Sequence, residues 1–278
     1  MAGIMGWPVA HSRSPALHGF WLAEHGIDGA YVPLAVEPNR LEQALRALPA
    51  LGFRGCNLTI PHKQAALRAM DRVDPFARRI GAMNTVVIAA DGSLEGSNTD
   101  VFGFRENLRE QAPEWDAKAG PAAVLGSGGS ARSVVAALIA DGVSEIRLVN
   151  RTTAHAEELA RDLAQPETRI AIHPWEARNA ALHDASILIN TTSLGMDKEP
   201  PLDIDLSGLP VSAVVVDIVY VPLETGLLAA ARRRGNRVVD GLGMLLHQGR
   251  PGFEAWFGVA VGVTPALRAA MLGTFAPR

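Results

Sequence analysis

The sequence predicts an α/β protein of two domains, the second of them doubly wound. Short apolar runs alternate with amphipathic segments along the chain, which is typical of βαβ units and a mostly parallel sheet. The chain has 278 residues, enough for two domains that each bury a core. Hydrophobic residues make up 48% and charged residues 20%, the composition of a folded protein.

The first α/β pattern occupies about a hundred residues. Its expected strands are 2–5, 30–36, 53–59 and 83–89, and its expected helices are 15–26, 37–48 and 61–70. The segment DGSLEGSNTD (91–100) is rich in Gly, Ser, Asn and Asp. We expect it to end this pattern and to lead into a helix over 101–111.

A second alternation follows, with expected strands at 121–126, 145–150, 185–190 and 212–220 and helices at 130–140 and 153–163. These strands are almost continuously apolar, as expected when helices cover both faces of a sheet. This part therefore predicts a doubly wound domain. Two further helices are expected beyond Val238, in DGLGMLLHQGRPGFEAWFG and TPALRAAMLGTF.

Charge and cysteine content exclude several classes of protein. The formal net charge of −3 gives no general attraction to nucleic acid or anionic membranes, so we expect neither as a partner. The single cysteine, Cys56, cannot form an intrachain disulfide, and a cytoplasmic location is the default. We expect no signal peptide or membrane span. The eight histidines lack HExxH or CxxC companions, so we expect no metal site.

A glycine turn joins the first strand of the second domain to its helix. In LGSGGSA, residues Gly126, Gly128 and Ala131 fit G-x-G-x-x-G/A, with Ser127, Gly129 and Ser130 between them. Small residues let the backbone approach a pyrophosphate, which then lies on N–H groups at the helix start. A purely structural turn is the alternative, but the flanking strand and helix favour nucleotide binding.

The end of the next strand indicates which dinucleotide binds. An NAD site would place Asp or Glu there, whereas this chain has Asn150, Arg151 and Thr152. A guanidinium can grip a 2′-phosphate that a carboxylate would repel, so we predict NADP. The alternative is that Arg151 is an ordinary solvated residue.

Three polar clusters in the first domain are candidates for substrate chemistry. In HSRSP, Ser12 and Ser14 precede a helix and could hold a carboxylate, although Ser14 could simply cap that helix with Pro15 at its first position. In NLTIPHK, Asn57 and Thr59 should face the same side of a strand.

Lys63 follows in the same cluster. Pro61 suits a first helical position, so Lys63 should lie in the first turn of a helix, where the dipole disfavours a cation. In SNTD, Asp100 begins a helix and could be only its cap. Asn84 adds an amide near a strand start, and a structural asparagine would look the same.

These motifs, in this order, make the chain similar to the shikimate dehydrogenase family. The resemblance covers essentially the whole chain and rests on HSRSP, NLTIPHK, GAMNT, NTD, GSGGSAR, NRT, NTTSLGM and DGLGMLLHQ. It implies reversible reduction of 3-dehydroshikimate to shikimate by NADPH in aromatic amino-acid biosynthesis. It also implies a substrate domain formed by 1–101 and 239–278, with the last helices returning to it, and a Rossmann NADP-binding domain over 102–238.

The resemblance also implies roles for individual residues. Lys63 and Asp100 resemble the family's catalytic pair, and Ser12 and Ser14 with Tyr220 would hold the substrate carboxylate. The hydroxyls of the substrate would be surrounded by Asn57, Thr59, Asn84, Asp100 and Gln248. Gly126 to Ala131 would carry the pyrophosphate, Asn150 to Thr152 the 2′-phosphate, and Gly241 would lie near the nicotinamide. Members often have a second arginine where this chain has His155, which weakens the 2′-phosphate clamp.

The resemblance gives Lys63 a chemical task. As hydride reaches the ketone carbon, charge develops on oxygen, and a nearby acid must neutralise it. The helix start would favour release of the Lys63 proton and Asp100 would oppose it, so the two effects have opposite sign.

Two other functions remain open. A quinate/shikimate dehydrogenase using NAD would accept an extra hydroxyl, and His155 is compatible with it. A metabolite sensor of the same fold would not need the Lys63 and Asp100 pair. The sequence leaves monomer and homodimer equally open.

Overall fold

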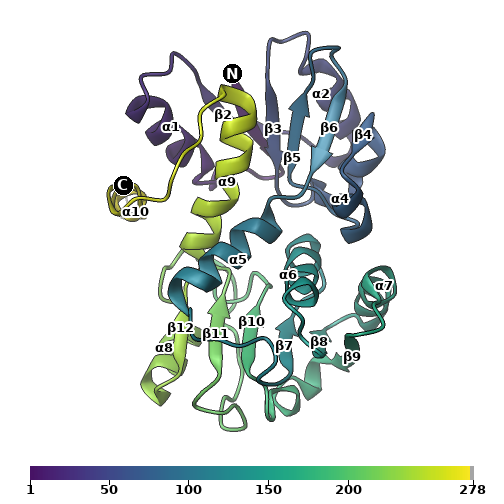
Figure 1. Cartoon of the computed structure of the whole chain (residues 1–278), viewed down its shortest axis with the longest axis vertical. Helices are drawn as coiled ribbons and strands as arrows, with labels where there is room; N and C mark the ends of the chain where they lie inside the picture. The colour runs from purple at the N-terminus through teal and green to yellow at the C-terminus, as the bar shows by residue number, and fades with distance from the viewer. Residues whose placement is uncertain (276–278) are drawn as a thin grey trace. The chain divides into compact units, whose positions relative to one another are not determined.

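The structure, a computed structural model, describes residues 1–275 and divides the chain into two compact units. Unit 1 contains Met1–Gly103 together with the chain from Leu245 onward, and unit 2 contains Phe104–Met244. The boundaries fall inside two helices, α5 (Asp100–Gln111) and α9 (Gly241–Phe257). Figure 1 colours the chain by residue number.

Unit 1 contains a mixed six-stranded sheet in the order β2-β1-β3-β5-β6-β4. Its strands are β1 (Ala2–Gly6), β2 (Tyr31–Ala35), β3 (Gly55–Leu58), β4 (Arg72–Val73), β5 (Thr85–Ile88) and β6 (Leu94–Ser97). Strand β1 pairs in parallel with β2 and β3, and β4 pairs in parallel with β6. Strand β5 runs antiparallel to β3 and β6, so this sheet is more mixed than the alternation of elements suggested.

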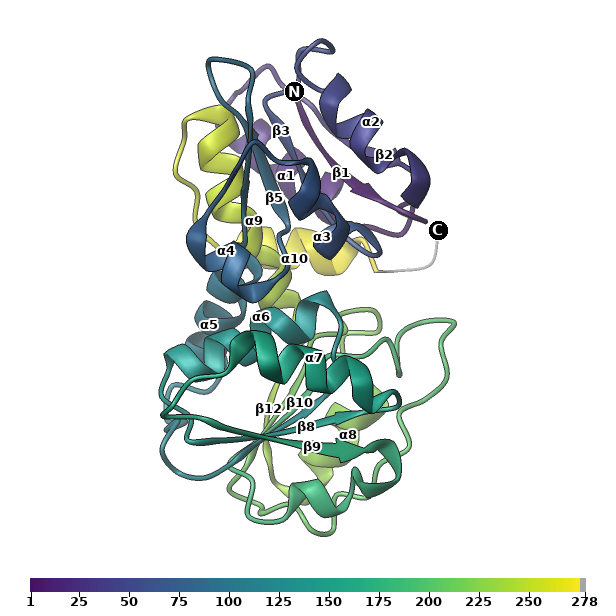
Figure 2. The same ribbon diagram turned by 90° about the vertical axis from the view of Figure 1, so that its right-hand side faces the viewer.

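Helices cover both faces of this sheet. They are α1 (Ser14–Glu24), η1 (Pro38–Arg40), α2 (Leu41–Ala47), α3 (His62–Ala65), η2 (Ala66–Ala69), α4 (Pro75–Ile80) and α10 (Pro265–Gly273), with most of α9. Cys56 and Leu58 of β3 belong to the same core cluster as Leu45 of α2. Because neighbouring residues of a strand face opposite sides, Asn57 points away from that core. Figure 2 shows α2 and α9 on opposite sides of β1 and β3.

Unit 2 contains a six-stranded sheet in the order β12-β11-β10-β7-β8-β9, parallel throughout. Its strands are β7 (Ala122–Leu125), β8 (Glu145–Asn150), β9 (Arg169–Pro174), β10 (Ile187–Asn190), β11 (Val214–Asp217) and β12 (Arg237–Val239). The helices are α6 (Gly129–Ala140), α7 (Thr153–Leu163), η3 (Trp175–Ala177), η4 (Ala180–Leu182) and α8 (Gly226–Arg234). Figure 2 shows α6 and α7 on one face of the sheet and α8 on the other, which confirms the doubly wound fold.

The strand order of unit 2 reverses direction between β7 and β10. In sheets of this kind, ligands bind outside the carboxyl ends of the strands at that point. The core beneath it is aliphatic and combines Leu125, Leu188 and Val215 of three strands with Leu228 of α8.

Several elements differ from the sequence-based expectation. The segment 91–100 does not end the sheet pattern, because it contains β6. Its sequence LEGS has a weak strand signal, because it is short and contains the glycine Gly96. The expectation also lacked β4, α4, β9, α8 and β12. Among the described residues, no helix is long and apolar enough to cross a membrane.

Candidate active site

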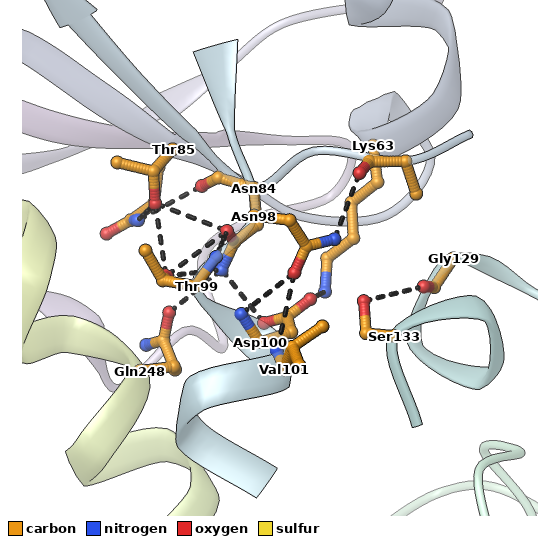
Figure 3. A network of polar contacts seen from close by, with 12 residues as sticks. Lys63, Asn84, Thr85, Asn98, Thr99, Asp100, Val101, Gly129, Ser133 and Gln248 are labelled. Atoms are coloured by element: carbon orange, nitrogen blue, oxygen red, sulfur yellow. Dashed lines mark hydrogen bonds and ion pairs between the residues drawn. The ribbon is translucent and has the colours of Figure 1, made fainter. Parts of the chain in front are cut away.

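Lys63 and Asp100 form an ion pair in unit 1. Lys63 is the second residue of α3, which follows β3, and Asp100 is the first residue of α5. Lys63 Nζ lies 2.6 Å from Asp100 Oδ2, and the two side chains are 14% and 6% exposed. Little water surrounds the pair, so its attraction is screened less than that of a surface ion pair. Figure 3 shows the two side chains meeting end to end.

The local backbone differs from the expected proline start. Pro61 is the residue before α3 rather than its first helical residue, and the helix has only four residues before it tightens into η2. One turn sums few peptide dipoles, so the helix-start argument for a loosely held Lys63 proton loses most of its basis. Asp100 is an ionic partner that contacts the Lys63 ammonium directly.

Asn84 connects Asp100 to the rest of the polar network. Its Nδ2 lies 2.8 Å from Asp100 Oδ1 and 3.1 Å from Gln248 Oε1, and its Oδ1 accepts the N–H of Thr99 at 2.7 Å. Asn84 is buried and precedes β5, as expected from the sequence. The amide thus links α5 to α9 within unit 1 (Figure 3).

Asp100 is not the cap of α5. The side chain of Asn98 accepts the N–H groups of Asp100 and Val101 at 3.0 and 3.4 Å, which is the role of a capping residue. The carboxylate of Asp100 is therefore left for Lys63 and Asn84.

The serine cluster also differs from a simple cap. Helix α1 begins at Ser14, the preceding residue is Arg13, and no side chain caps it. Ser14 is buried, and its N–H donates to Ser12 Oγ at 3.3 Å. Burial raises the pKa of the Tyr31 phenol, and the nearby Ser14 side chain acts in the opposite direction. Ser12, half-buried, is the more accessible of the two serines.

Asn57 and Thr59 lie at the end of β3. Tyr31 donates to Asn57 Oδ1 at 2.7 Å, and Asn57 Nδ2 donates to Asn84 O at 3.0 Å and to Thr85 Oγ1 at 3.1 Å. Thr59 follows the strand and is half-buried. Sequence reasoning missed Tyr31 and Thr85, because both are strand residues whose partners lie far along the chain.

The glycine turn of unit 2 has the geometry that a phosphate site needs. Gly126 has φ +105°, and a Cβ there would lie 2.7 Å from Thr191 Oγ1, so only glycine fits without strain. Gly128 precedes α6, and a Cβ there would meet nothing within 4 Å. Ala131 is fully buried against the sheet. The start of α6, formed by Gly129 and Ser130 after Ser127, is partly exposed, and helix starts are where proteins commonly bind anions.

The residues expected at the 2′-phosphate follow β8, the neighbour of β7. Asn150 Nδ2 donates to Thr152 O at 2.8 Å, and Thr152 precedes α7. Arg151, Thr152 and His155 are exposed. Buried Arg132 of α6 contacts Asp162 and Glu158 of α7, which holds the two helices together beside this turn.

The remaining expected residues are divided between the units. Gln248 belongs to unit 1, whereas Tyr220 and Gly241 belong to unit 2. Tyr220 is half-buried and follows β11. Gly241 begins α9, where a side chain would collide with Ile218 O. Within residues 1–275, no group of three or more His, Cys, Asp or Glu side chains could hold a metal ion.

Comparison with known proteins covers nearly the whole chain. Residues 4–86 match the shikimate dehydrogenase substrate binding domain, and residues 108–196 match the shikimate / quinate 5-dehydrogenase family. A shikimate dehydrogenase (NADP(+)) of Rhodospirillum rubrum is 61% identical over 274 residues, which cover 98% of this chain and 97% of the relative. Its counterpart in Paramagnetospirillum magneticum is 58% identical, covering 98% of each chain.

Solved structures agree with these relatives. Shikimate 5-dehydrogenase from Thermus thermophilus, in complex with NADP(H) and shikimate, has a TM-score of 0.84 and 37% identity, with 97% of each chain covered. Quinate dehydrogenase from Corynebacterium glutamicum, in complex with NAD, has a TM-score of 0.89 and 33% identity, with 98% of each chain covered. At 61% identity over almost its full length, the chain belongs to the NADP-dependent shikimate dehydrogenase family.

Proposed function

We propose that this protein catalyses the reversible, NADPH-dependent reduction of 3-dehydroshikimate to shikimate. The observation that carries the proposal is the ion pair of the half-buried Lys63 with the buried Asp100, which Asn84 joins to Gln248. A protein that only binds a metabolite has no need to bury a lysine and a carboxylate 2.6 Å apart beside a row of alcohol-binding groups.

Lys63 acts as the general acid in the direction of reduction. When bound, NADPH supplies a hydride to the ketone carbon, and the oxygen of that ketone gains negative charge. Lys63 Nζ gives a proton to this oxygen, and in the reverse direction it takes the proton from the substrate hydroxyl. Asp100 orients the ammonium and keeps it beside the reacting oxygen, while Asn84 fixes the carboxylate through its second oxygen.

The substrate carboxylate and hydroxyls have separate receptors in this proposal. Ser12 and Ser14 hold the carboxylate, with Tyr220 as a third partner. Asn57, Thr59, Asn84, Asp100 and Gln248 surround the hydroxyls. Alternating donors and acceptors of this kind discriminate strongly for hydroxyl groups, because a substrate without them leaves buried polar groups unpaired.

NADP occupies the turn of unit 2 in this proposal. The open start of α6 and the positive φ of Gly126 fit a pyrophosphate on backbone N–H groups. The exposed Arg151, between Asn150 and Thr152, fits a 2′-phosphate. Gly241 allows the nicotinamide end to approach the backbone. Residues 102–238 then form the NADP-binding domain, and residues 1–101 with 239–278 form the substrate domain.

An absorbance assay of reduced nicotinamide tests the proposal. Purified protein is given shikimate or quinate together with NADP⁺ or NAD⁺, in all four combinations. We expect turnover to be fastest with shikimate and NADP⁺. Faster turnover of quinate with NAD⁺ would identify a quinate/shikimate dehydrogenase, and binding of shikimate without turnover would identify a sensor.

Two further expectations accompany this function. The single cysteine and the soluble substrate pair favour a cytoplasmic enzyme. The proposed substrate site and the proposed NADP site each consist of residues from a single chain. The proposed chemistry is therefore compatible with a monomer or a homodimer. Size-exclusion chromatography with light scattering distinguishes the two.

A further inference from the structure

The phenol of Tyr31 lies between the two proposed substrate receptors of unit 1. Its hydroxyl donates to Asn57 Oδ1 at 2.7 Å. Burial raises the pKa of Tyr31, and the nearby Ser14 side chain acts against that rise, so Ser14 lies within reach of the phenol. Ser14 belongs to the carboxylate receptor and Asn57 to the hydroxyl receptor. Tyr31 is only 7% exposed, so it is placed to connect the two groups rather than to contact the substrate.

The remaining hydrogen bonds of Asn57 connect Tyr31 to Asn84 and Thr85. Asn57 Nδ2 donates to Asn84 O at 3.0 Å and to Thr85 Oγ1 at 3.1 Å. Thr85 Oγ1 in turn lies 3.2 Å from Asn84 Oδ1. A continuous row of buried hydrogen bonds therefore runs from Tyr31, beside Ser14, to the amide that holds Asp100. Buried networks in which every member is bonded are rigid and specify one arrangement.

A buried histidine lies flat on the Tyr31 ring. The rings of His18 and Tyr31 are stacked with centroids 3.9 Å apart and an angle of 4° between their planes. His18 is fully buried, and neither of its ring nitrogens has a hydrogen-bond partner among the described residues. Trp21 and Phe253 complete an aromatic shell around it.

The unpartnered nitrogens of His18 need an explanation, because a buried polar atom without a partner is costly. Burial lowers the pKa of His18 to about 3, so the imidazole is neutral and packs as a flat aromatic ring. Burial also raises the pKa of Tyr31, which keeps its phenol a hydrogen-bond donor. The neutral His18 ring thus packs against the ring of Tyr31, whose phenol remains a hydrogen-bond donor.

We propose that Tyr31 is a positioning residue that fixes the distance between Ser14 and Asn57, and that the stacked His18 ring holds the phenol in place. This inference rests on the proposed function, since it concerns how the same site recognises a molecule with a carboxylate at one end and hydroxyls at the other. Neither residue touches the reacting atoms. Their effect should therefore appear in substrate affinity and not in the chemical step.

The first test is Tyr31→Phe, which keeps the ring and removes only the hydroxyl. We expect the KM for shikimate to rise at least fivefold, with kcat changed less than threefold and the KM for NADP⁺ unchanged. Asp74→Ala is the matched control, because it removes the helix cap on Phe76 and Ala77 in the same unit and costs a similar amount of stability. That variant should keep the wild-type KM.

A double-mutant cycle separates positioning from independent contact. If Tyr31 acts through Ser14, the combined Tyr31→Phe and Ser14→Ala change should raise the KM by less than the product of the two single changes. If the KM of the double variant instead rises by the full product of the two single effects, the Tyr31 hydroxyl acts independently of Ser14. That result would overturn the proposal.

The histidine is tested with two variants. His18→Phe keeps the stacked ring and should leave the KM for shikimate within twofold of wild type, whereas His18→Ala should raise it as Tyr31→Phe does. Equal KM values for the Ala variant and the wild type would exclude the supporting role.

The outcomes also separate this inference from the proposed function. A wild-type protein that does not oxidise shikimate with NADP⁺ would refute both. An active wild type, together with a Tyr31→Phe variant of unchanged KM, would refute the positioning role alone.

Discussion

Lys63 and Asp100 share a hydrogen bond of 2.6 Å within unit 1, and Asp100 uses its other carboxylate oxygen for Asn84. Both oxygens of the carboxylate are thereby held, one by the Lys63 ammonium and the other by the Asn84 amide. This arrangement favours a proton carrier that is oriented before the substrate arrives.

Lys63→Ala should reduce kcat for shikimate oxidation at least about 100-fold, the range in which positioned acids and bases contribute. The KM for shikimate should change only a few-fold, because the main interaction lost is with charge that develops in the transition state. Steady-state kinetics measure both constants. Lys118→Ala, a change at an exposed lysine of unit 2, is the control. A kcat close to wild type would exclude Lys63 as the acid.

Arg151→Ala should weaken NADP⁺ binding without affecting NAD⁺. Loss of a charge-assisted contact to a 2′-phosphate is worth roughly 1.5–3 kcal/mol, so the KM for NADP⁺ should rise about tenfold or more. The control is Arg161→Ala, which changes an exposed arginine in the last turn of α7, the helix that begins two residues after Arg151. If the KM rises equally for NADP⁺ and NAD⁺, Arg151 does not contact the 2′-phosphate.

His155→Arg should strengthen the preference for NADP⁺ over NAD⁺, whereas Arg151→Ala should weaken it. An arginine at this exposed first-turn position of α7 would add a second cation beside Arg151. We expect the ratio of kcat/KM for NADP⁺ over NAD⁺ to increase severalfold. His173→Arg, in strand β9, controls for the added charge. An unchanged ratio would place position 155 outside the cofactor site.

The comparison of sequence and structure shows which features are locally determined. Strand β8 and helix α7 have the expected bounds, because their periodicity is strong and turn residues flank them. Strand β6 was missed because its short sequence contains glycine, and its place depends on pairing with β5. The Tyr31 to Asn57 bond joins residues 26 apart and has no local signal, so only the folded chain reveals it.

In the candidate site, too, local sequence indicates some features, whereas others depend on the folded chain. Motifs indicated Lys63, Asn84 and Asp100 as separate polar residues, and each had an ordinary structural alternative. For Asp100, the alternative role as a cap belongs instead to Asn98. A sequence alone could not assign it, because Asn98 and Asp100 are both good capping residues two positions apart.

Asp217 should make the protein more stable as the pH falls from 7 to 5. The carboxyl is buried at the end of β11, and burial raises its pKa from 3.8 to about 6 despite bonds from Thr225, Val219 and Asn190. The folded state therefore binds a proton between pH 6 and 4 that the unfolded state does not, and lowering the pH favours folding.

Asp217→Asn removes this dependence while keeping the shape of the side chain. Between pH 7 and 5, the wild type should gain about 1 kcal/mol of unfolding free energy relative to the variant. Urea unfolding at both pH values measures it, and contributions of other groups cancel in the comparison. A difference between the two proteins that does not change with pH would contradict the raised pKa.

His18 should have the opposite effect on stability. Burial lowers its pKa from 6.5 to about 3, so between these values the unfolded state binds a proton that the folded state cannot. Stability is therefore lost as the pH falls below 6.5, by about 2 kcal/mol between pH 7 and 5. His18→Phe keeps the stack on Tyr31 and has no titrating group, so it should escape this loss. Urea unfolding at pH 7 and 5 should show the variant gaining on the wild type as the pH falls. Parallel losses in both proteins would mean that the His18 ring accepts a proton in the folded state, and hence that a partner reaches one of its nitrogens.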